Sequence, residues 1–277
     1  MQDVHLTASM RILAGLLESR TGQVLSENRL WRLETSLRPV LRANGLPSLD
    51  ALVAAIQADP GGALARAAVN ALLNNETSFF RDGHIFDMLA HDLLPALMRA
   101  IGEARRERTL RIWCAGCSTG QEAYSLAMLF RNHQDQWPDW RLRIVATDIS
   151  TLAVERARSG LFSQIDVQRG LAINDLLRWF EPVGEQWRIH ASLREMIDFR
   201  VDNLFEDKAP AGFCDIIFCR NVLLYFSPGR KAELFRILAR HCEAGSYLLL
   251  GAGEAVIGQS TDFVASRRFR GTYERIE

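Results

Sequence analysis

The sequence predicts an α/β protein in which a sheet domain follows a small all-helical domain. Residues 5–73 consist of helical stretches separated by turns. From residue 110, short apolar runs alternate with helical stretches, which is the pattern of a parallel sheet covered on both faces. Residues 164–196 break this alternation and contain the turn EPVGE between two alternating runs, which predicts an inserted β-hairpin.

The helical domain is predicted over residues 1–73. Four leucines recur at three- and four-residue steps and therefore lie on one helix face: Leu30, Leu33, Leu37 and Leu41. The stretch ANGLPS at 43–48 and the turn DPGG at 59–62 separate this helix from two further ones, and Pro39 is expected to interrupt it. A helical linker is expected over 74–105.

The sheet domain is predicted over residues 106–277, with a small β-subdomain inserted at about 161–200. Its expected strands are 110–116, 142–150, 197–203, 214–221 and 246–254. Helices are expected over 118–132, 151–160 and 228–241. Residues 262–276 resemble two strands joined by a turn, which would close the sheet as an antiparallel edge.

Composition excludes several classes of protein. The formal net charge is zero, so the basic excess typical of nucleic-acid binders is missing. The odd number of cysteines, five, and their apolar surroundings indicate reduced thiols, and the CxxC of Cys114 and Cys117 is interpreted as packing and not as a metal site. No signal peptide and no apolar run of about 20 residues is present, so a cytoplasmic protein without membrane insertion is expected.

Polar groups follow the predicted strands. Gly116 and Gly120 lie in the turn after the first strand, where glycine allows close approach of a ligand to the backbone. Asp148 ends the second strand, where doubly wound folds place a carboxylate on the ribose of a nucleoside. Asp148 could instead cap the helix that begins at Ser150 or Thr151.

Two further strands end in polar residues, Asp202 with Asn203 and Arg220 with Asn221. Ligands of open α/β sheets bind at the carboxyl ends of the strands. We therefore expect four residues to converge on one site: Glu122, Asp148, Asn203 and Asn221.

Five motifs resemble the CheR family of chemoreceptor glutamate methyltransferases. They are NNETSFFRD, WCAGCSTGQEAYSLAM, ATDIS, VDNL and DIIFCRNVLLYF, in this order, and the N-terminal TGQVLSENRLWRLETSLRP resembles the family's first domain. The resemblance implies a Rossmann-like methyltransferase domain with an inserted β-subdomain. It also implies S-adenosylmethionine as cofactor, S-adenosylhomocysteine as product and no metal.

The resemblance also implies the cofactor contacts, with the linker forming one wall of the site. They are Asn75, Thr77, Arg81, Glu122, Asp148, Asn203, Leu204, Arg220 and Asn221. Many family members carry GEEPYS where this chain has GQEAYS, so the acid is assigned to Glu122. Phe79 and Phe80 are expected to pack the segment, and Glu76 is left open.

The implied reaction is methyl transfer to a glutamate carboxylate, which is already ionised at neutral pH and needs no general base. A cation gripping the nucleophile would stabilise the ground state, so Arg81 and Arg220 are expected to position groups. Tyr225 is a candidate for orienting the substrate; its alternative role is packing.

Partners also follow from the resemblance. Chemoreceptor helices are acidic, and Arg29, Arg32, Arg38 and Arg42 make the second helix locally basic, although they flank the leucine stripe on both sides and could be merely solvated. The short EPVGEQ connection favours an enzyme that does not depend on a C-terminal receptor pentapeptide, and a monomer is expected.

Three other classes remain as alternatives. A non-catalytic signalling module that binds S-adenosylmethionine or S-adenosylhomocysteine would not need the full set of polar groups. A nucleic-acid methyltransferase conflicts with the neutral charge and with the missing Asn/Asp-Pro-Pro-Tyr motif. A nicotinamide-dependent dehydrogenase conflicts with the missing GxGxxG.

Overall fold

In the computed structural model the chain forms two compact units. The structure describes residues 7–25, 32–104, 107–206, 210 and 212–276. One unit contains Met1–Asn74 and Tyr225–Arg230, and the other contains Asn75–Leu224 and Lys231–Glu277. Arg29 and Leu30, both used in the sequence analysis, lie outside the described residues.

The first unit is helical, with α1 (Ala8–Thr21), α2 (Arg32–Ala43), α3 (Leu49–Ala58) and α4 (Ala63–Leu72). Thr7 and Ser48 cap α1 and α3 by accepting hydrogen bonds from backbone N–H groups of the first turn. Leu33 and Leu37 of the predicted stripe are fully buried in its core. The expected interruption at Pro39 was wrong, because α2 continues through it.

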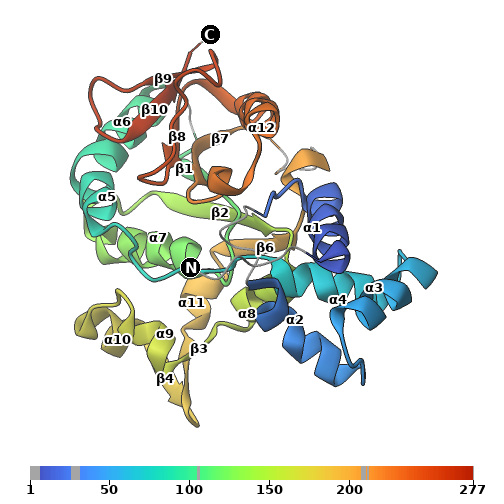
Figure 1. The fold of residues 1–277 in the computed structure, drawn as a ribbon. Coiled ribbons are helices and arrows are strands. Elements are labelled where there is room, and N and C mark those ends of the chain that lie inside the picture. Colours follow the sequence, from blue (N-terminus) through green and yellow to red (C-terminus); the bar gives the residue numbers. More distant parts are fainter. Residues whose placement is uncertain (1–6, 26–31, 105–106, 207–209, 211, 277) are drawn as a thin grey trace. The chain divides into compact units, whose positions relative to one another are not determined.

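The second unit contains a seven-stranded sheet with the order β6-β2-β1-β7-β8-β10-β9 (Figure 1). The strands β6, β2, β1, β7 and β8 pair in parallel, and β10 is antiparallel to both β8 and β9. Their bounds are β1 Thr109–Ala115, β2 Arg141–Asp148, β6 Ile197–Val201, β7 Cys214–Cys219, β8 Cys242–Leu250, β9 Phe263–Ala265 and β10 Thr272–Arg275. The predicted α/β class and the antiparallel closing strands are confirmed.

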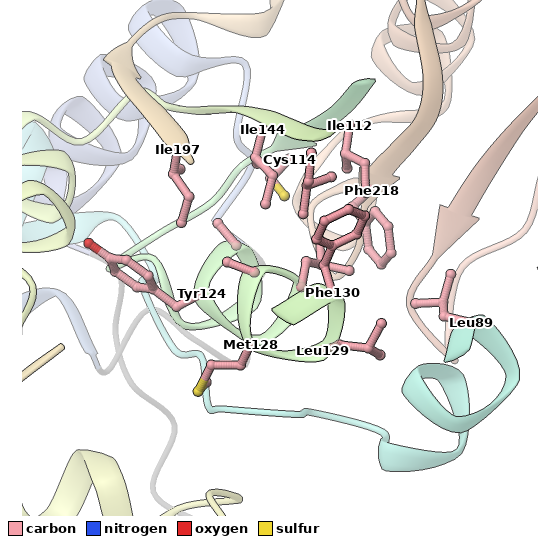
Figure 2. Close-up of a cluster of buried hydrophobic side chains, with 14 of the residues drawn as sticks. Leu89, Ile112, Cys114, Tyr124, Met128, Leu129, Phe130, Ile144, Ile197 and Phe218 are labelled. Carbon is pink, nitrogen blue, oxygen red and sulfur yellow. The ribbon is translucent and has the colours of Figure 1, made fainter. Parts of the chain in front are cut away.

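Helices cover both faces of this sheet. The helix α7 (Gln121–Asn132) packs Phe130 towards apolar residues that include Ile112 of β1 and Phe218 of β7 (Figure 2). Its Tyr124 contacts Phe199 of β6, with ring centroids 5.4 Å apart. On the opposite face, the Trp113 ring packs edge-on against His241, which follows α12 (Pro228–Arg240). Outside the insertion, the described residues also form α5 (Gly83–Met88), η2 (Leu89–Leu93), α6 (Leu94–Ala104), η3 (Gln134–Gln136), α8 (Thr151–Ser159), η4 (Leu204–Glu206) and η5 (Leu223–Tyr225).

The insertion forms a separate three-stranded sheet with the order β3-β5-β4. The strands β4 (Phe180–Val183) and β5 (Gln186–Ile189) form the predicted hairpin, in which Gly184 has a φ of 59°. The third strand β3 (Leu161–Ser163) and the helices α9 (Gln164–Gln168), α10 (Ile173–Trp179) and α11 (Ala191–Arg194) complete it. Sequence reasoning missed β3, because three residues are too short to show an alternating pattern.

Candidate functional site

The loop after β1 connects the end of β2 to the segment 75–82. Ser118 donates its backbone N–H to Asp148 Oδ2 at 2.8 Å and its hydroxyl to the backbone oxygen of Asn75 at 2.7 Å. Phe80 donates its backbone N–H to Ser125 Oγ of α7 at 2.9 Å. The segment is therefore tied to the carboxyl-end side of the sheet, as expected for one wall of a site.

Asp148 is buried at the end of β2, and both of its carboxylate oxygens accept hydrogen bonds. Oδ1 accepts from the backbone N–H of Ser150 at 2.8 Å, while Oδ2 is held by Ser118. Burial raises the pKa of Asp148, and the backbone N–H donors oppose this rise. The helix α8 is capped by the Ser150 hydroxyl, which accepts from Ala153 N at 3.2 Å, so the capping role that was the alternative for Asp148 belongs to Ser150.

Arg220 forms a buried cluster with two acids. Its side chain is 1% exposed and donates to Glu122 Oε2 at 2.6 Å, to Asp82 Oδ2 at 2.5 Å and to the backbone oxygen of Arg81 at 3.1 Å. Burial raises the pKa of Glu122, and the neighbouring Arg220 guanidinium counteracts this rise. Arg220 thereby links the end of β7, the start of α7 and the segment 75–82, which is a positioning role.

Four non-glycine residues with positive φ occur among the described residues, and all four lie in these loops. They are Phe80 at 46°, Asp82 at 60°, Ser118 at 51° and Asn221 at 60°. Such conformations cost of order 1–3 kcal/mol each and cluster at functional sites. Their grouping around one end of the sheet is an independent indication that a site lies there.

The two phenylalanines of the segment pack against the protein. The fully buried Phe79 makes edge contacts with Phe162 and Phe180 of the inserted subdomain, with ring centroids 5.0 and 5.6 Å apart. Phe80 packs edge-on against Phe86 of α5 at 5.1 Å. A Cβ at Gly170, whose φ is 87°, would lie 2.0 Å from the Phe79 backbone oxygen, so this close approach requires glycine.

The remaining predicted contacts have the following surroundings. Asn75 donates weakly to Ser150 Oγ at 3.5 Å, and Arg81 donates to the backbone oxygen of Glu76 at 3.3 Å. Asn203 accepts from the backbone N–H of Phe205 at 3.1 Å and so also stabilises its own turn, while Leu204 is half-buried.

Tyr225 belongs to the other unit. There its hydroxyl accepts a hydrogen bond from Asn74 Nδ2 at 2.5 Å, and its backbone oxygen accepts from Val24 N at 2.7 Å. Its substrate-orienting role stays a prediction.

The glycines after β1 are required by packing within the protein. A Cβ at Gly116 would lie 2.5 Å from Val222 Cγ2, and one at Gly120 would lie 2.9 Å from Ala157 Cβ. Both residues have positive φ, 82° and 91°. The presence of glycine at positions 116 and 120 is therefore explained by the backbone and packing of the turn itself, without a ligand.

An open hollow of about 290 Å³ adjoins the segment 75–77. It is lined by Asn75, Glu76, Thr77, Thr119, Gln121, Leu152, Ala153, Arg156, Asp166 and Arg169. Glu76, left open by the sequence, pairs with Arg169 at 3.3 Å across exposed surface. Thr77 lines this hollow together with Asn75.

Sequence reasoning missed several residues of the site. Asp82 and Ser118 hold Arg220 and Asp148, but neither type stands out in a loop. Glu254 accepts hydrogen bonds from three backbone N–H groups after β7 and β8. Glu254 could have been predicted from the sequence, because it lies at the end of the fifth predicted strand just as the other candidates lie at the ends of theirs.

The five cysteines are free and buried. Burial raises the pKa of the Cys114 and Cys117 thiols well above the ordinary value, which disfavours reactive thiolates. Both residues pack in the main core. Among the described residues, no helix has the length and apolar character that crossing a membrane requires.

Comparison with known proteins identifies the family. The profile described as "CheR methyltransferase, SAM binding domain", where SAM is S-adenosylmethionine, matches residues 75–270. The chain is 36% identical over 247 residues to the chemotaxis protein methyltransferase Cher2 of Pseudomonas putida, covering 87% of this chain and 88% of the relative. It is also 36% identical to the chemotaxis protein methyltransferase of Vibrio parahaemolyticus, with 91% of each chain covered, and to chemotaxis protein methyltransferase 1 of Pseudomonas aeruginosa, with 90% of each covered. The chain therefore belongs to the CheR family of chemotaxis methyltransferases that use S-adenosylmethionine.

Proposed function

We propose that the chain transfers the methyl group of S-adenosylmethionine to glutamate side chains on the cytoplasmic helices of chemoreceptors, forming methyl esters. The observation that supports this proposal is that all four acids of the site are held by hydrogen bonds from within the protein. Asp82 and Glu122 accept from Arg220, whereas Asp148 and Glu254 accept from backbone N–H groups. Acids held in this way suit a nucleophile that is already ionised and needs no general base.

The donors and acceptors of the site fit S-adenosylmethionine chemically. The carboxylate of Asp148 accepts backbone hydrogen bonds from Ser118 and Ser150, and its remaining lone pairs can accept from a ribose hydroxyl. Glu122 offers a carboxylate to the methionine ammonium group. The buried Nε of Arg220 has no hydrogen-bond partner among the described residues, so a polar group is needed beside it.

Other residues complete the proposed cofactor site. Asn75, Thr77 and Arg81 would contact the cofactor from the linker side, and Asn203, Leu204 and Asn221 would line the adenine and the reacting end. S-adenosylmethionine supplies a methyl group on a sulfonium, and the transfer to a carboxylate is an in-line displacement that neutralises both charges.

The protein's contribution is orientation and exclusion of water. Holding two reactants in line contributes about 7–11 kcal/mol to lowering the barrier. Because opposite charges are partly neutralised in the transition state, a cation gripping the carboxylate would stabilise the ground state more and slow the transfer. Arg220 avoids this effect, since its two Nη groups are engaged by Glu122, Asp82 and the Arg81 carbonyl. Arg81 and Tyr225 are proposed to position the substrate.

The methyl ester provides the direct test. Incubation with labelled S-adenosylmethionine and receptor-containing membranes from the same cell is expected to label the receptors, and mild base is expected to release the label as methanol. Label that enters total RNA, or that resists base, would contradict a carboxylate ester. Binding of S-adenosylhomocysteine without any transfer would instead favour the non-catalytic signalling module.

Acidification is expected to weaken cofactor binding. Burial raises the pKa of Glu122, so its carboxylate becomes protonated as the pH falls through a value above the ordinary 4.5. We expect S-adenosylhomocysteine affinity, measured by calorimetry, to be lower at about pH 5 than at about pH 7.5, with a limiting slope of about tenfold per pH unit below the pKa of Glu122. Folding stability should not fall through Glu122 in this range, because a raised carboxyl pKa in the folded state favours folding as the pH falls.

The matched control for this dependence is Glu122→Gln. Its amide does not titrate, so the variant should bind S-adenosylhomocysteine weakly and with a smaller pH dependence, to which Asp148 still contributes. Equal affinity of the unmodified protein at both ends of the pH range would contradict the role of Glu122.

Receptor docking is proposed to use Arg29, Arg32, Arg38 and Arg42, of which the last three belong to α2. Reversal of Arg29 and Arg32 to glutamate is expected to raise the KM for receptor while S-adenosylhomocysteine affinity stays unchanged, because acidic receptor helices would be repelled. Arg38 and Arg42 are exposed on α2 and lie on the other edge of the leucine stripe. Reversal of these two arginines, with KM for receptor as the readout, provides the comparison. An unchanged KM in the variant with Arg29 and Arg32 reversed would remove this edge from the interface.

The chain is proposed to act as a monomer and without a receptor pentapeptide. Only two residues, Gly184 and Glu185, connect β4 and β5 of the inserted sheet. Enzymes that add a peptide strand at this sheet are expected to have a longer and more glycine-rich connection. Retention of the protein on an immobilised receptor C-terminal peptide would contradict independence of the pentapeptide. Sedimentation measures the oligomeric state, and a dimer would contradict the monomer.

A further inference from the structure

Glu254 connects the carboxyl ends of the two neighbouring strands β7 and β8. Its Oε2 accepts from the backbone N–H of Asn221 at 2.8 Å and from the backbone N–H of Gly251 at 2.7 Å. Its Oε1 accepts from the backbone N–H of Leu224 at 3.3 Å. One carboxylate thus satisfies three N–H groups in two loops that the parallel sheet brings together.

One of the residues held by Glu254 is Asn221. Its φ of 60° is left-handed, a conformation that asparagine tolerates better than most residues but that still requires support from its surroundings. A Cβ at Gly251 would lie 2.7 Å from Asn221 Nδ2 and 2.9 Å from Glu254 Oε2. The Asn221 side chain therefore lies directly over Gly251, in a space that only glycine leaves open.

We propose that Glu254 is a positioning residue of the methyltransferase site, which sets the backbone and thereby the side-chain amide of Asn221. This inference rests on the proposed function in one respect, the contact between Asn221 and the cofactor. Glu254 itself needs no contact with cofactor or substrate. Hydrogen bonds to a charged acceptor are stronger than neutral ones, so a carboxylate holds the strained residue more firmly than an amide would.

Glu254 also acts on the charge balance of the site. Burial is the main cause that raises the pKa of Glu122 and of Cys219, and the negative charge of Glu254 adds to both rises. Removal of this charge should therefore shift the acid limb of S-adenosylhomocysteine binding to lower pH. A residue that only stabilised the fold would not shift this limb.

The experiment is a double-mutant cycle on S-adenosylhomocysteine affinity. Glu254→Ala and Asn221→Gly are each expected to weaken binding about five- to tenfold, and glycine is chosen because it accepts the left-handed backbone. If Glu254 acts through the Asn221 side chain, the double variant should bind about as weakly as Asn221→Gly alone. Additive losses, or an affinity of Glu254→Ala within about twofold of the unmodified protein, would overturn the proposal.

Two further variants cover the case in which Glu254→Ala does not fold. Glu254→Gln keeps an acceptor oxygen and the side-chain length but loses the charge, so it should bind S-adenosylhomocysteine more weakly than the unmodified protein does. Gly251→Ala places a Cβ 2.7 Å from the Asn221 amide and 2.9 Å from Glu254 Oε2, so it crowds both groups and should also weaken binding. Unchanged affinity in both variants would contradict the positioning role.

Asp215 provides a matched control on β7, the strand that precedes Asn221. It is buried near the beginning of β7, away from the site end of that strand, and its Oδ2 accepts from the backbone N–H of Arg111 at 2.8 Å. Asp215→Ala should lower the melting temperature without changing S-adenosylhomocysteine affinity. Failure of receptor methylation would contradict the proposed substrate, but it would leave this binding cycle interpretable.

Discussion

Replacement of Asp148 by alanine is expected to weaken S-adenosylmethionine binding by about a hundredfold or more, because hydrogen bonds to a charged group contribute roughly 1.5–3 kcal/mol each and two ribose hydroxyls would lose their acceptor. The structure adds a second cost. The two backbone N–H groups of Ser118 and Ser150 would lose their partner in a buried place, at about 1–3 kcal/mol each. The variant should therefore melt at a lower temperature as well as lose affinity in calorimetry.

Asp198 gives the control for this substitution. It is an exposed acid on β6, the neighbour of β2, and it pairs with Arg200 at 2.5 Å. Asp198→Ala should change neither affinity nor melting temperature appreciably, because exposed ion pairs contribute only about 0–1 kcal/mol. Unchanged affinity in Asp148→Ala, measured below its melting temperature, would remove Asp148 from the cofactor site.

Arg220→Met is expected to have the largest effect on stability. The substitution keeps much of the volume but leaves Glu122 and Asp82 without their shared cation. Loss of one partner of a buried ion pair costs roughly 3–5 kcal/mol, which is an upper range here because the Asp82 side chain is 33% exposed and can be hydrated. The loss of stability should appear as a lower midpoint of urea unfolding, monitored by tryptophan fluorescence.

The same variant has a characteristic pH dependence. Arg220 opposes the rise in the pKa of Glu122, so its removal should raise that pKa further. Glu122 would then lose its charge at a higher pH, and the acid limb of S-adenosylhomocysteine binding should move upward.

Arg200→Met is the matched control, because Arg200 also pairs with an acid but is 45% exposed. Its free energy of unfolding, obtained from the urea titration, should change by about 1 kcal/mol or less, as expected for a surface ion pair. Equal midpoints for Arg220→Met and Arg200→Met would show that the buried cluster does not stabilise the protein.

The sheet and the meeting of its strand ends could be predicted from sequence. Asp148 is the last residue of β2 and Arg220 comes directly after β7, and parallel neighbours end at the same edge of a sheet. Their proximity therefore follows from strand order alone. The packing of Phe79 was expected as well, because two large aromatic residues in a polar segment suit burial.

The partners of these side chains could not be predicted. Nothing in the local pattern indicates that Arg220 bonds Asp82 and Glu122, which lie 138 and 98 residues away in the chain. The capping of α8 by Ser150 in place of Asp148 also depends on backbone geometry. The course of α2 through Pro39 is another case, since tertiary packing of Leu33 and Leu37 outweighs the local preference of proline.

By itself the sequence determined the α/β class, the family and the chemical types of the site residues, because periodicity and motif spacing are local properties of the chain. Only the tertiary structure decided which groups face one another. The Arg220 cluster, the left-handed Asn221 and the bridge made by Glu254 all arise where loops from different strands meet. Hydrogen bonding requires approach to about 3 Å, and only the packed sheet sets distances that small between residues far apart in sequence.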